Sequence, residues 1–489
     1  MKLILALLPI ISFFIMVVIV KKNILYGAVT SFVLSTILGV LFYNSSFINL
    51  INSCMEGAWN SFVILIVVFN ALLLFNILKE SGSFEMICKW ISDNILDEYN
   101  RIIFVGWGFS SLLQGISGFG VPVAVVAPIL TKMGLNPIQA IIICLLGHSW
   151  GGTFGTLGIA WDTMLAQIPN SDLISYNSLL IGTCCYLSVF NIISGIVICF
   201  VINKKFNKKS VLTSLAVSLT QCIVLLLASL ISTKIAFLSM MLILLLDRGL
   251  NDLKKIDSHY FIKSFIPFIV MIIVLAFYLL PVSLSNLNDI CIGFPFKVDD
   301  GIRIYGETHI FTHSGTVLLI VALINWLIYR KKIHSNKAVF AKTVNGSIRA
   351  ILPIVFLLMT ARIMVGSGQT DIIALKIGEF TSNSYGFFAP YIGILGGFVC
   401  SSNMSSNILF TYLQYNIAIS QGINVNLILA AQTAGGAIGI LMSSNSIILG
   451  STTLEISNVE SEIMKKMMCV CVFTGGVLGV LCLVFTLGG

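Results

Sequence analysis

The sequence contains few charged residues. Lys, Arg, Asp and Glu make up 10% of its 489 residues, whereas apolar residues make up 57%. A soluble globular protein carries about 25% charged residues. This deficit excludes a protein whose surface lies mostly in water and indicates one whose surface lies mostly in lipid. The net charge of +8 does not indicate a nucleic-acid partner, because the basic residues lie in short loops between apolar runs.

Motifs for metal binding, redox chemistry and hydrolysis are also missing. The twelve cysteines lie mostly within apolar runs and lack the spacing of metal ligands or of a secreted disulfide framework. There is no P-loop, H-E-x-x-H or G-x-S-x-G motif, which argues against ATP-driven transport within this chain and against a hydrolase. Ser149 follows His148, but neighbouring residues on a helix point in different directions and do not form a nucleophile–base pair. We therefore expect neither an enzyme nor a cofactor.

Long apolar runs recur from end to end, and a run of about 20 apolar residues is long enough to cross a bilayer as a helix. We expect an all-α polytopic protein of the cell membrane with about 12–14 membrane segments. The first run lacks a cleavage site and is expected to be a retained span rather than a signal peptide. The apolar segments are 3–20, 24–43, 58–78, 101–131, 137–165, 178–203, 211–231, 233–247, 260–281, 309–329, 347–366, 386–420, 425–455 and 467–487. Residues 44–57 and 79–100 are expected to hold short interfacial helices.

The distribution of charge predicts the sidedness of the chain. Basic clusters are expected in the cytoplasm, and the acidic loop 282–308 outside. The stretches 101–165 and 386–455 must then each cross the membrane an odd number of times, although each contains two long segments interrupted by Gly and Ser. One re-entrant hairpin and one broken helix in each stretch satisfy this count, with opposite orientations. The basic clusters are Lys21–Lys22, Lys204–Lys205, Lys208–Lys209, Lys254–Lys255, Arg330–Lys332 and Lys465–Lys466.

The sequence therefore predicts two inverted repeats. A shift of 288 residues brings four glycines of the first stretch onto glycines of the second, and Ser117 onto Ser405. We divide the chain into a first repeat half (1–209), a connecting part with the outer loop (210–308) and a second repeat half (309–489). The superposed glycines are Gly108 and Gly396, Gly134 and Gly422, Gly147 and Gly435, and Gly151 and Gly439.

The interrupted segments are candidates for a substrate site near the middle of the membrane. Glycines break the first at residues 115–120, and Pro122 suits the first turn of a new helix. Free N–H groups at such a helix N-terminus attract an anion. The second contains hydroxyl and amide side chains at 401–407; the alternative for both segments is close packing of small residues. The expected substrate contacts are Gln114, Ser117, Gly118, Gly120, Ser402, Asn403, Ser405, Ser406, Asn407, Thr433 and Gly435.

Arg362, His148 and Asp162 are among the ionisable residues that lie within apolar segments, where charge is costly. Arg362 is a candidate for attracting a substrate carboxylate, the alternatives being a snorkelling side chain or an ion pair with Asp371. His148 is a candidate for carrying a coupling proton, and Asp162 is a candidate for carrying a coupling proton or cation. Packing is the alternative for His148, and a place at the outer interface is the alternative for Asp162. Asn403, with backbone carbonyls, is the candidate for holding a coupling sodium ion.

These segments resemble those of the L-lactate permease family. The first match runs from Gln114 to Ala124 and continues through Gly134–Pro137. The second runs from Ser402 to Asn407, with Phe410 and Gln414, and the third from Thr433 to Gly436. Weaker similarity covers nearly the whole chain. The resemblance implies a proton-coupled carrier of lactate, glycolate or a similar 2-hydroxy monocarboxylate.

The chain departs from the family pattern at several ionisable positions. Gln114 and Asn403 stand where the family has acidic residues, Ile440 where it has a lysine, and His148 where it has no histidine. We expect a symporter of a small monocarboxylate, driven by protons, with a sodium-coupled carrier of another organic anion as the alternative. A passive channel is a third possibility, which electrodiffusive flux without saturation would reveal. The expected partners are the anion and the lipid bilayer, with the chain as a monomer or a homodimer.

Overall fold

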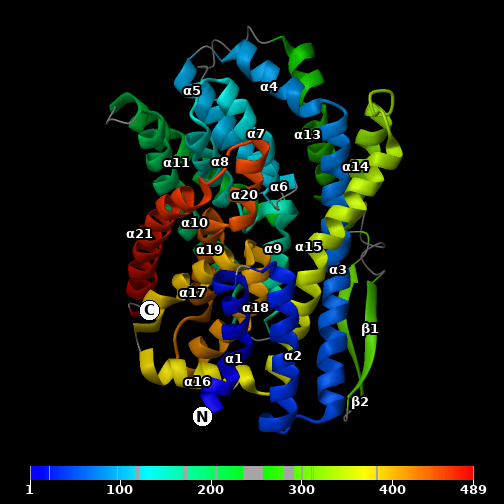
Figure 1. The fold of residues 1–489 in the computed structure, drawn as a ribbon, viewed down its shortest axis with the longest axis vertical. Helices are drawn as coiled ribbons and strands as arrows, with labels where there is room; N and C mark the ends of the chain where they lie inside the picture. Colours follow the sequence, from blue (N-terminus) through cyan, green and yellow to red (C-terminus); the bar gives the residue numbers. More distant parts are fainter. Residues whose placement is uncertain are drawn as a thin grey trace.

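A computed structural model gives the arrangement of the chain in space (Figure 1). It describes residues 2–20, 22–95, 97–116, 120–168, 173–203, 208–234, 257–279, 291–298, 301–309, 311, 313–381 and 384–487. The helices are α1 (Lys2–Phe14), α2 (Ile24–Tyr43), α3 (Phe47–Glu80), α4 (Ser83–Asn94), α5 (Glu98–Ile103), α6 (Ser110–Ile116), α7 (Val121–Lys132), α8 (Pro137–Ser149), α9 (Gly155–Leu165), α10 (Tyr176–Asn203), α11 (Lys208–Ile231), α13 (Ser258–Leu279), α14 (Ser314–Tyr329), α15 (Asn336–Gly366), α16 (Gln369–Thr381), α17 (Tyr385–Cys400), α18 (Asn403–Ser420), α19 (Val425–Gly439), α20 (Ser444–Thr453) and α21 (Glu460–Leu487).

Helices long and apolar enough to cross a membrane dominate the structure. Within the described ranges there are nine such helical spans, and four shorter apolar helices of 10–17 residues accompany them. The predicted all-α polytopic fold is therefore confirmed. The expected span at 233–247 lies almost wholly outside the described residues.

The first interfacial helix was wrongly separated from the span that follows it. The sequence predicts a span from residue 58 and a separate interfacial helix at 44–57, because polar residues interrupt the apolar run there. The structure instead continues one helix, α3, from Phe47 to Glu80. Ser46 caps its start by accepting a hydrogen bond from the Asn49 backbone N–H (3.1 Å). The segment 79–100 does contain a separate short helix, α4.

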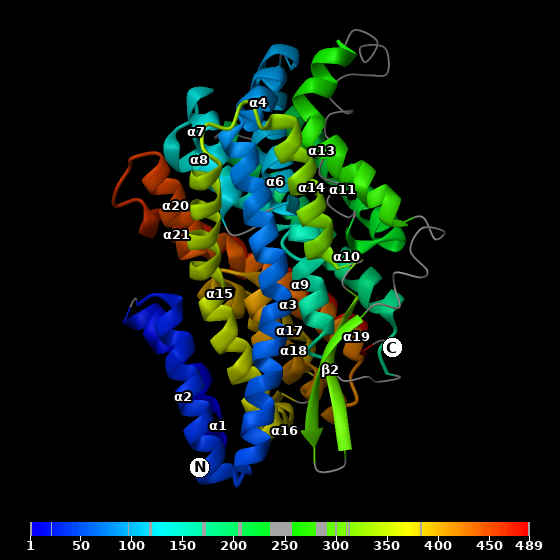
Figure 2. The same cartoon turned by 90° about the vertical axis from the view of Figure 1, so that its right-hand side faces the viewer.

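The longest helices, α3 and α15, pack side by side in antiparallel directions. Asn76 of α3 donates a hydrogen bond to Thr343 near the start of α15 (3.0 Å), while Gly57 packs against the backbone of Met359 toward its end. In Figures 1 and 2, α3 runs from the end that holds α16 to the end that holds α4, and α15 runs back. Together with α14, they form a wall beside the other helices.

The order of elements in the first half recurs in the second. Helices α3, α4, α8, α9 and α10 have counterparts of similar length in α15, α16, α19, α20 and α21. Helix α8 begins at Pro137 and α19 at Val425, which are 288 residues apart. The inverted symmetry of the two halves, and the boundaries at 209 and 308, stay predictions.

Two helical hairpins and two broken helices lie in the interior. Helices α6 and α7 approach from one end of the molecule, and α17 and α18 approach from the other (Figure 1). Helix α8 ends at Ser149 and α9 begins at Gly155, while α19 ends at Gly439 and α20 begins at Ser444. These are the interruptions that the glycines and serines predict.

A β-hairpin in the loop 282–308 was not predicted. Strands β1 (Cys291–Val298) and β2 (Gly301–His309) pair antiparallel, with Val298 opposite Gly301 and Cys291 opposite His309. The sequence of β2 has the alternation of apolar and polar residues that a strand requires, as Ile302 and Ile304 flank Arg303. This alternation is short and includes polar residues, so it is not visible as an apolar run that could cross a membrane. The hairpin lies away from the connection between α14 and α15 (Figure 2).

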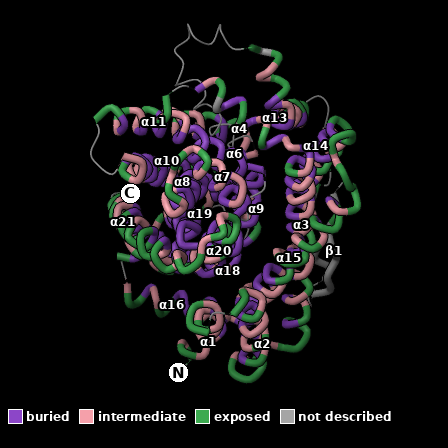
Figure 3. The backbone as a smooth tube through the Cα atoms, turned by 45° about the horizontal axis from the view of Figure 1, so that its top comes forward, coloured by how far each residue is buried: buried purple, intermediate pink, exposed green. Residues whose placement is uncertain are grey.

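Burial separates an inner group of helices from a rim. Buried residues are concentrated on α6, α8, α9, α18 and α19, whereas α1, α2, α11 and α21 expose their outer faces (Figure 3). The exposed side chains are apolar: Leu212 is 67% exposed on α11, and Phe473 is 62% exposed on α21. Such a surface is stable only against lipid. The inner group is where the hairpins and broken helices meet.

Packing of α3 on α15 requires a glycine at position 57. A Cβ on Gly57 would lie 2.6 Å from the Met359 Cα, so Gly57→Ala forces the helices apart. We expect a loss of roughly 1–3 kcal/mol of stability, as for other overpacked sites. Melting of the detergent-purified protein, followed by size-exclusion fluorescence, measures it. Gly346→Ala on α15 is the control, since its added Cβ meets only Leu72 Cδ1 at 3.5 Å; equal melting temperatures for the two variants would contradict the expectation.

Candidate functional site

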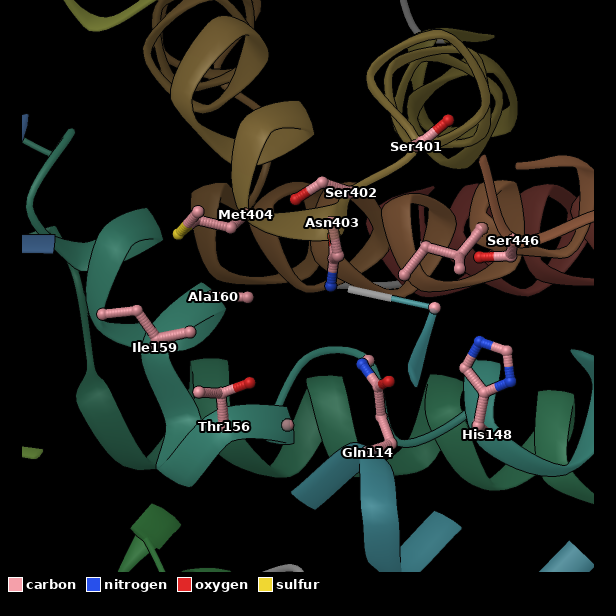
Figure 4. Close-up of a pocket in the computed structure, with 14 residues that line it drawn as sticks. Gln114, His148, Thr156, Ile159, Ala160, Ser401, Ser402, Asn403, Met404 and Ser446 are labelled. Carbon is pink, nitrogen blue, oxygen red and sulfur yellow. The ribbon is translucent and has the colours of Figure 1, made fainter. Parts of the chain in front are cut away.

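A small cavity lies where both hairpins and both helix breaks meet. Its volume is about 40 Å³, which accommodates only a few water-sized groups. Figure 4 shows the polar side chains that face it from opposite sides. The cavity is lined by Gln114, Gly120, His148, Gly152, Gly155, Thr156, Ile159, Ala160, Ser401, Ser402, Asn403, Met404, Ile440 and Ser446.

Two helices begin at this cavity. Gly120 precedes α7 with a φ of +78°, a conformation that glycine adopts without strain. Ser401 ends α17 with a φ of +53°, and Ser402 caps α18 by accepting from the Ser405 N–H (3.3 Å). The first N–H groups of a helix have no partner within it, and the helix dipole adds partial positive charge there. The cavity is therefore placed to accept an anion although none of the described residues that line it is Lys or Arg.

Asn403 and Asn407 of α18 are held by a shared network of hydroxyl groups. Asn403 Nδ2 donates to Thr153 Oγ1 (3.0 Å) and to Thr433 Oγ1 (3.4 Å). Asn407 Nδ2 donates to Thr433 Oγ1 (3.0 Å) and to the Ala160 carbonyl (3.0 Å). The two hydroxyl groups lie 3.2 Å apart, and Thr153 Oγ1 also lies 3.3 Å from the Thr433 carbonyl. The network joins α18, α19, α9 and the turn between α8 and α9.

The hydrogen-bond donors of this network are all used within it. Thr153 donates to the Thr433 carbonyl and Thr433 donates to Thr153, so both hydroxyl protons and both amide groups are used. Only the amide oxygens of Asn403 and Asn407 are buried without a partner. These oxygens accept hydrogen bonds or coordinate a cation, and do not attract an anion. Both asparagines therefore shape the site without a free N–H to give to a carboxylate.

His148 is the one titratable side chain among the described residues that line the cavity. Its Nδ1 lies 2.6 Å from the Cys144 carbonyl oxygen, which can only accept, so Nδ1 carries a hydrogen. In the neutral imidazole Nε2 is then a bare acceptor. Nε2 is buried and has no partner within the protein. A proton bound there would make His148 a donor directed toward the cavity.

Gln114 is positioned by the helix break opposite it. A Cβ on Gly155 would lie 3.0 Å from the Gln114 Nε2 and from its backbone oxygen, so glycine is needed for this contact. The following residues, Thr156 and Leu157, have φ values of +49° and +54°. Left-handed backbone at such residues costs about 1–3 kcal/mol and is found where a site requires it. The Gln114 Oε1 is buried without a hydrogen-bond partner.

Several residues predicted from the sequence lie outside the cavity lining. Ser117 and Gly118 fall outside the described residues. Ser405 is buried on α18, and Ser406 donates to the Gly393 carbonyl (3.0 Å). Gly435 gives α19 room to contact the Pro390 carbonyl of α17. Thr433 is hydrogen-bonded to Asn403, and Asn407 is hydrogen-bonded to Thr433, so both lie behind the lining. The predicted residues that reach the cavity itself are Gln114, Gly120, His148, Ser402 and Asn403.

Arg362 and Asp162 also lie apart from the cavity. Arg362 forms an ion pair with Glu56 of α3 (3.2 Å) and donates to the Ala166 carbonyl after α9 (2.7 Å). The pair with Asp371 considered in the sequence analysis is not formed, because Asp371 accepts from Asn416 (2.7 Å). Asp162 is half-buried and interacts electrostatically with Lys234.

The cavity also contains residues that the sequence analysis did not select. Thr156 and Ile159 come from the strained turn and the start of α9, and Ser446 comes from the first turn of α20. Thr153, behind the lining, belongs to the turn before α9. The signal available was their place beside a predicted helix break. Nothing in their types marks them, because Thr, Ile and Ser are also ordinary packing residues.

Comparison with known proteins places these features in a family. The family model for L-lactate permease matches residues 2–246 and 254–487. A putative L-lactate permease of Haemophilus influenzae is 26% identical over 91% of this chain and 92% of its own length. The L-lactate permease of Streptococcus iniae is 26% identical over 76% of this chain and 81% of its own length. The glycolate permease GlcA of Escherichia coli is 24% identical, with 94% and 91% of the two chains covered.

The hydroxyl network predicts a strong effect of Thr433→Val. The variant leaves the Asn403 and Asn407 N–H groups without their shared acceptor, at a cost of about 1–3 kcal/mol for a buried unpaired group. We expect solute uptake into proteoliposomes to fall by about tenfold or more. Thr411→Val is the matched control, because the Thr411 hydroxyl is buried without a partner. Equal uptake by the two variants would refute the role of Thr433.

The ion pair predicts a different result for Arg362. Arg362→Gln leaves Glu56, whose side chain is 21% exposed, unpaired within the helical wall, and a partly buried charge without its partner is destabilising. We expect the melting temperature to fall, and the double variant Glu56→Gln/Arg362→Gln to recover part of the loss. A lower apparent affinity for the solute with unchanged melting would instead give Arg362 the anion-attracting role predicted from the sequence.

Proposed function

Because the chain belongs to the L-lactate permease family, we propose that it carries L-lactate, glycolate or a similarly small 2-hydroxy monocarboxylate across the membrane together with protons. The chain is a multi-pass transporter of the cell membrane and not an enzyme. The relatives of the chain support this choice of substrate, because they are L-lactate and glycolate permeases. The small volume of the cavity favours a solute of this size over a larger anion.

The observation that carries the proposal is the meeting of two helix N-termini with one histidine in a single cavity. The N-termini of α7 and α18 supply partial positive charge, and no lysine or arginine among the described lining residues supplies a full charge. Burying a carboxylate there is costly unless a positive charge accompanies it. Protonation of His148 Nε2 provides that charge and a hydrogen-bond donor at once.

Coupling follows from mutual stabilisation of the two charges. A buried imidazolium is as unfavourable as a buried carboxylate when alone, but the pair is neutral. The loaded carrier and the empty, deprotonated carrier are then the states with the least buried charge. Exchange between these states moves one proton with each anion.

A second cavity favours an access route from one side. It has a volume of about 750 Å³, shares Ser401 with the central cavity, and is bordered by Lys22, Asn23 and Glu460. The α17–α18 tip therefore separates a wide space from the narrow one. Movement of this tip would open the site toward the side that the sequence analysis assigns to the cytoplasm.

A sodium-coupled carrier of another organic anion is the second candidate. The observation that favours it is the pair of unpartnered amide oxygens on Asn403 and Asn407, since neutral oxygens coordinate hard cations. Both candidates share the fold and the cavity, and they differ in the driving gradient.

The deciding experiment is uptake of radiolabelled lactate into proteoliposomes with proton and sodium gradients imposed separately. We expect saturable uptake driven by an inward proton gradient and inhibited by unlabelled glycolate. Uptake that follows only the sodium gradient would support the second candidate. No lactate uptake by folded, inserted protein would refute both the substrate and its coupling.

His148→Gln tests the proton carrier. Glutamine keeps a polar group facing the cavity but does not take up a proton near neutral pH. We expect accumulation driven by the proton gradient to fall by about tenfold or more, because the group that takes up the proton and offsets the charge of the carboxylate is lost. His334→Gln is the control, because His334 lies in the connection between α14 and α15. Unchanged accumulation by His148→Gln would remove His148 from the mechanism.

A further inference from the structure

The central cavity has an acceptor that neither a carboxylate nor a proton carrier explains. The Gln114 Oε1 is buried, has no hydrogen-bond partner and belongs to a side chain that is 7% exposed. Figure 4 shows the Gln114 amide directed into the cavity, with Asn403 and His148 around the same space. A carboxylate brings only acceptors, which leaves this oxygen without a donor.

The neighbouring side chains do not supply the missing donor. The N–H groups of Asn403 are committed to Thr153 and Thr433. Neutral His148 presents a bare Nε2, because its hydrogen is on Nδ1. The Gln114 side chain itself is held against Gly155, where no larger residue leaves room for it. Four hydroxyl groups, of Thr156, Ser401, Ser402 and Ser446, line the same cavity, but none of them forms a hydrogen bond with the Gln114 Oε1. A hydroxyl group on the solute would supply the donor that this oxygen lacks.

We propose that Gln114 is a specificity-determining residue, whose amide oxygen accepts a hydrogen bond from the hydroxyl group beside the carboxylate of the solute. This inference rests on the proposed function and adds to it the residue that separates hydroxy acids from their oxo and unsubstituted analogues. Pyruvate has an oxygen at that carbon but no O–H, and propionate has no oxygen there. Both analogues leave the Gln114 Oε1 unpaired on binding, and a site with an unpaired buried acceptor discriminates against such ligands.

The N-terminus of α18 is consistent with separate contacts for the carboxylate and the hydroxyl group of the solute. The N-terminus of α18 provides N–H groups for the carboxylate, and Gln114 lies on α6, in the opposite hairpin. A solute that has both a carboxylate and a neighbouring hydroxyl therefore contacts both hairpins. Hydrogen bonding to residues of both hairpins would favour binding of a hydroxy acid over binding of an analogue that contacts only one.

The test compares inhibition of radiolabelled lactate uptake by unlabelled lactate, pyruvate and propionate in proteoliposomes. For the unsubstituted protein we expect lactate to inhibit at concentrations roughly 10- to 100-fold lower than either analogue, which is the range for one unpaired buried group. In Gln114→Met, which has a similar shape and no acceptor, the difference should shrink to about threefold or less. Gln167→Met is the matched control, since Gln167 is also buried but lies outside the cavity lining.

A second variant keeps the inference testable if the methionine variant does not fold. Gln114→Glu retains the acceptor oxygens and adds a negative charge, so overall affinity should fall while the preference for lactate over propionate is kept. If Gln114→Met transports lactate and still prefers lactate over pyruvate and propionate, the role of Gln114 is overturned while the proposed function stands. Loss of the preference in Gln114→Glu would overturn that role too. Absence of saturable uptake in the unsubstituted protein would overturn both this inference and the proposed function.

Discussion

Unpaired backbone at the centre of the molecule is the constraint on which the rest of the structure depends. Helices α7 and α18 begin, and α8 and α19 end, inside a protein whose outer surface meets lipid. Lipid offers no hydrogen bonds, so irregular backbone at this depth is stable only where protein or a solvated cavity surrounds it. The inner helices satisfy this requirement by mutual coverage, and the rim helices α1, α2, α11 and α21 have no such requirement (Figure 3).

Glycine makes the coverage close enough. Gly393 and Gly397 of α17 contact the backbone of α19, and Gly439 of α19 contacts the backbone of α17 in return. Backbones at this separation exclude lipid from the second hairpin and bring the Asn403 amide against Gly436. Glycine lowers the intrinsic stability of each helix, but here the same glycines allow the helices around the site to pack closely.

The electrostatic design of the site follows from the absence of Lys, Arg, Asp and Glu among the described residues of its lining. An arginine in the cavity would bind a carboxylate tightly and retain it, whereas a helix N-terminus and one titratable histidine provide attraction that changes with protonation. Arg362, the cation that the sequence offered for this role, instead joins α3 and α15 to the end of α9 through Glu56 and the Ala166 carbonyl. Its charge supports the frame around the site.

The sequence by itself determined the helical membrane fold, the positions of the helix breaks and five of the residues that reach the cavity, because apolar length and glycine-rich interruptions are local properties of the chain. The sequence did not determine the β-hairpin, because the alternation of apolar and polar residues in its strands is short compared with the apolar runs. It also did not determine that α3 continues as one helix through the polar residues near its start. The sequence also did not determine the partners of Arg362 and Thr433. Glu56 reaches Arg362 only because α3 packs on α15, and Asn403 reaches Thr433 only because α18 packs on α19. Which interrupted segments face one another is a property of tertiary packing, and that packing alone decided that Gln114, His148 and Asn403 surround one cavity.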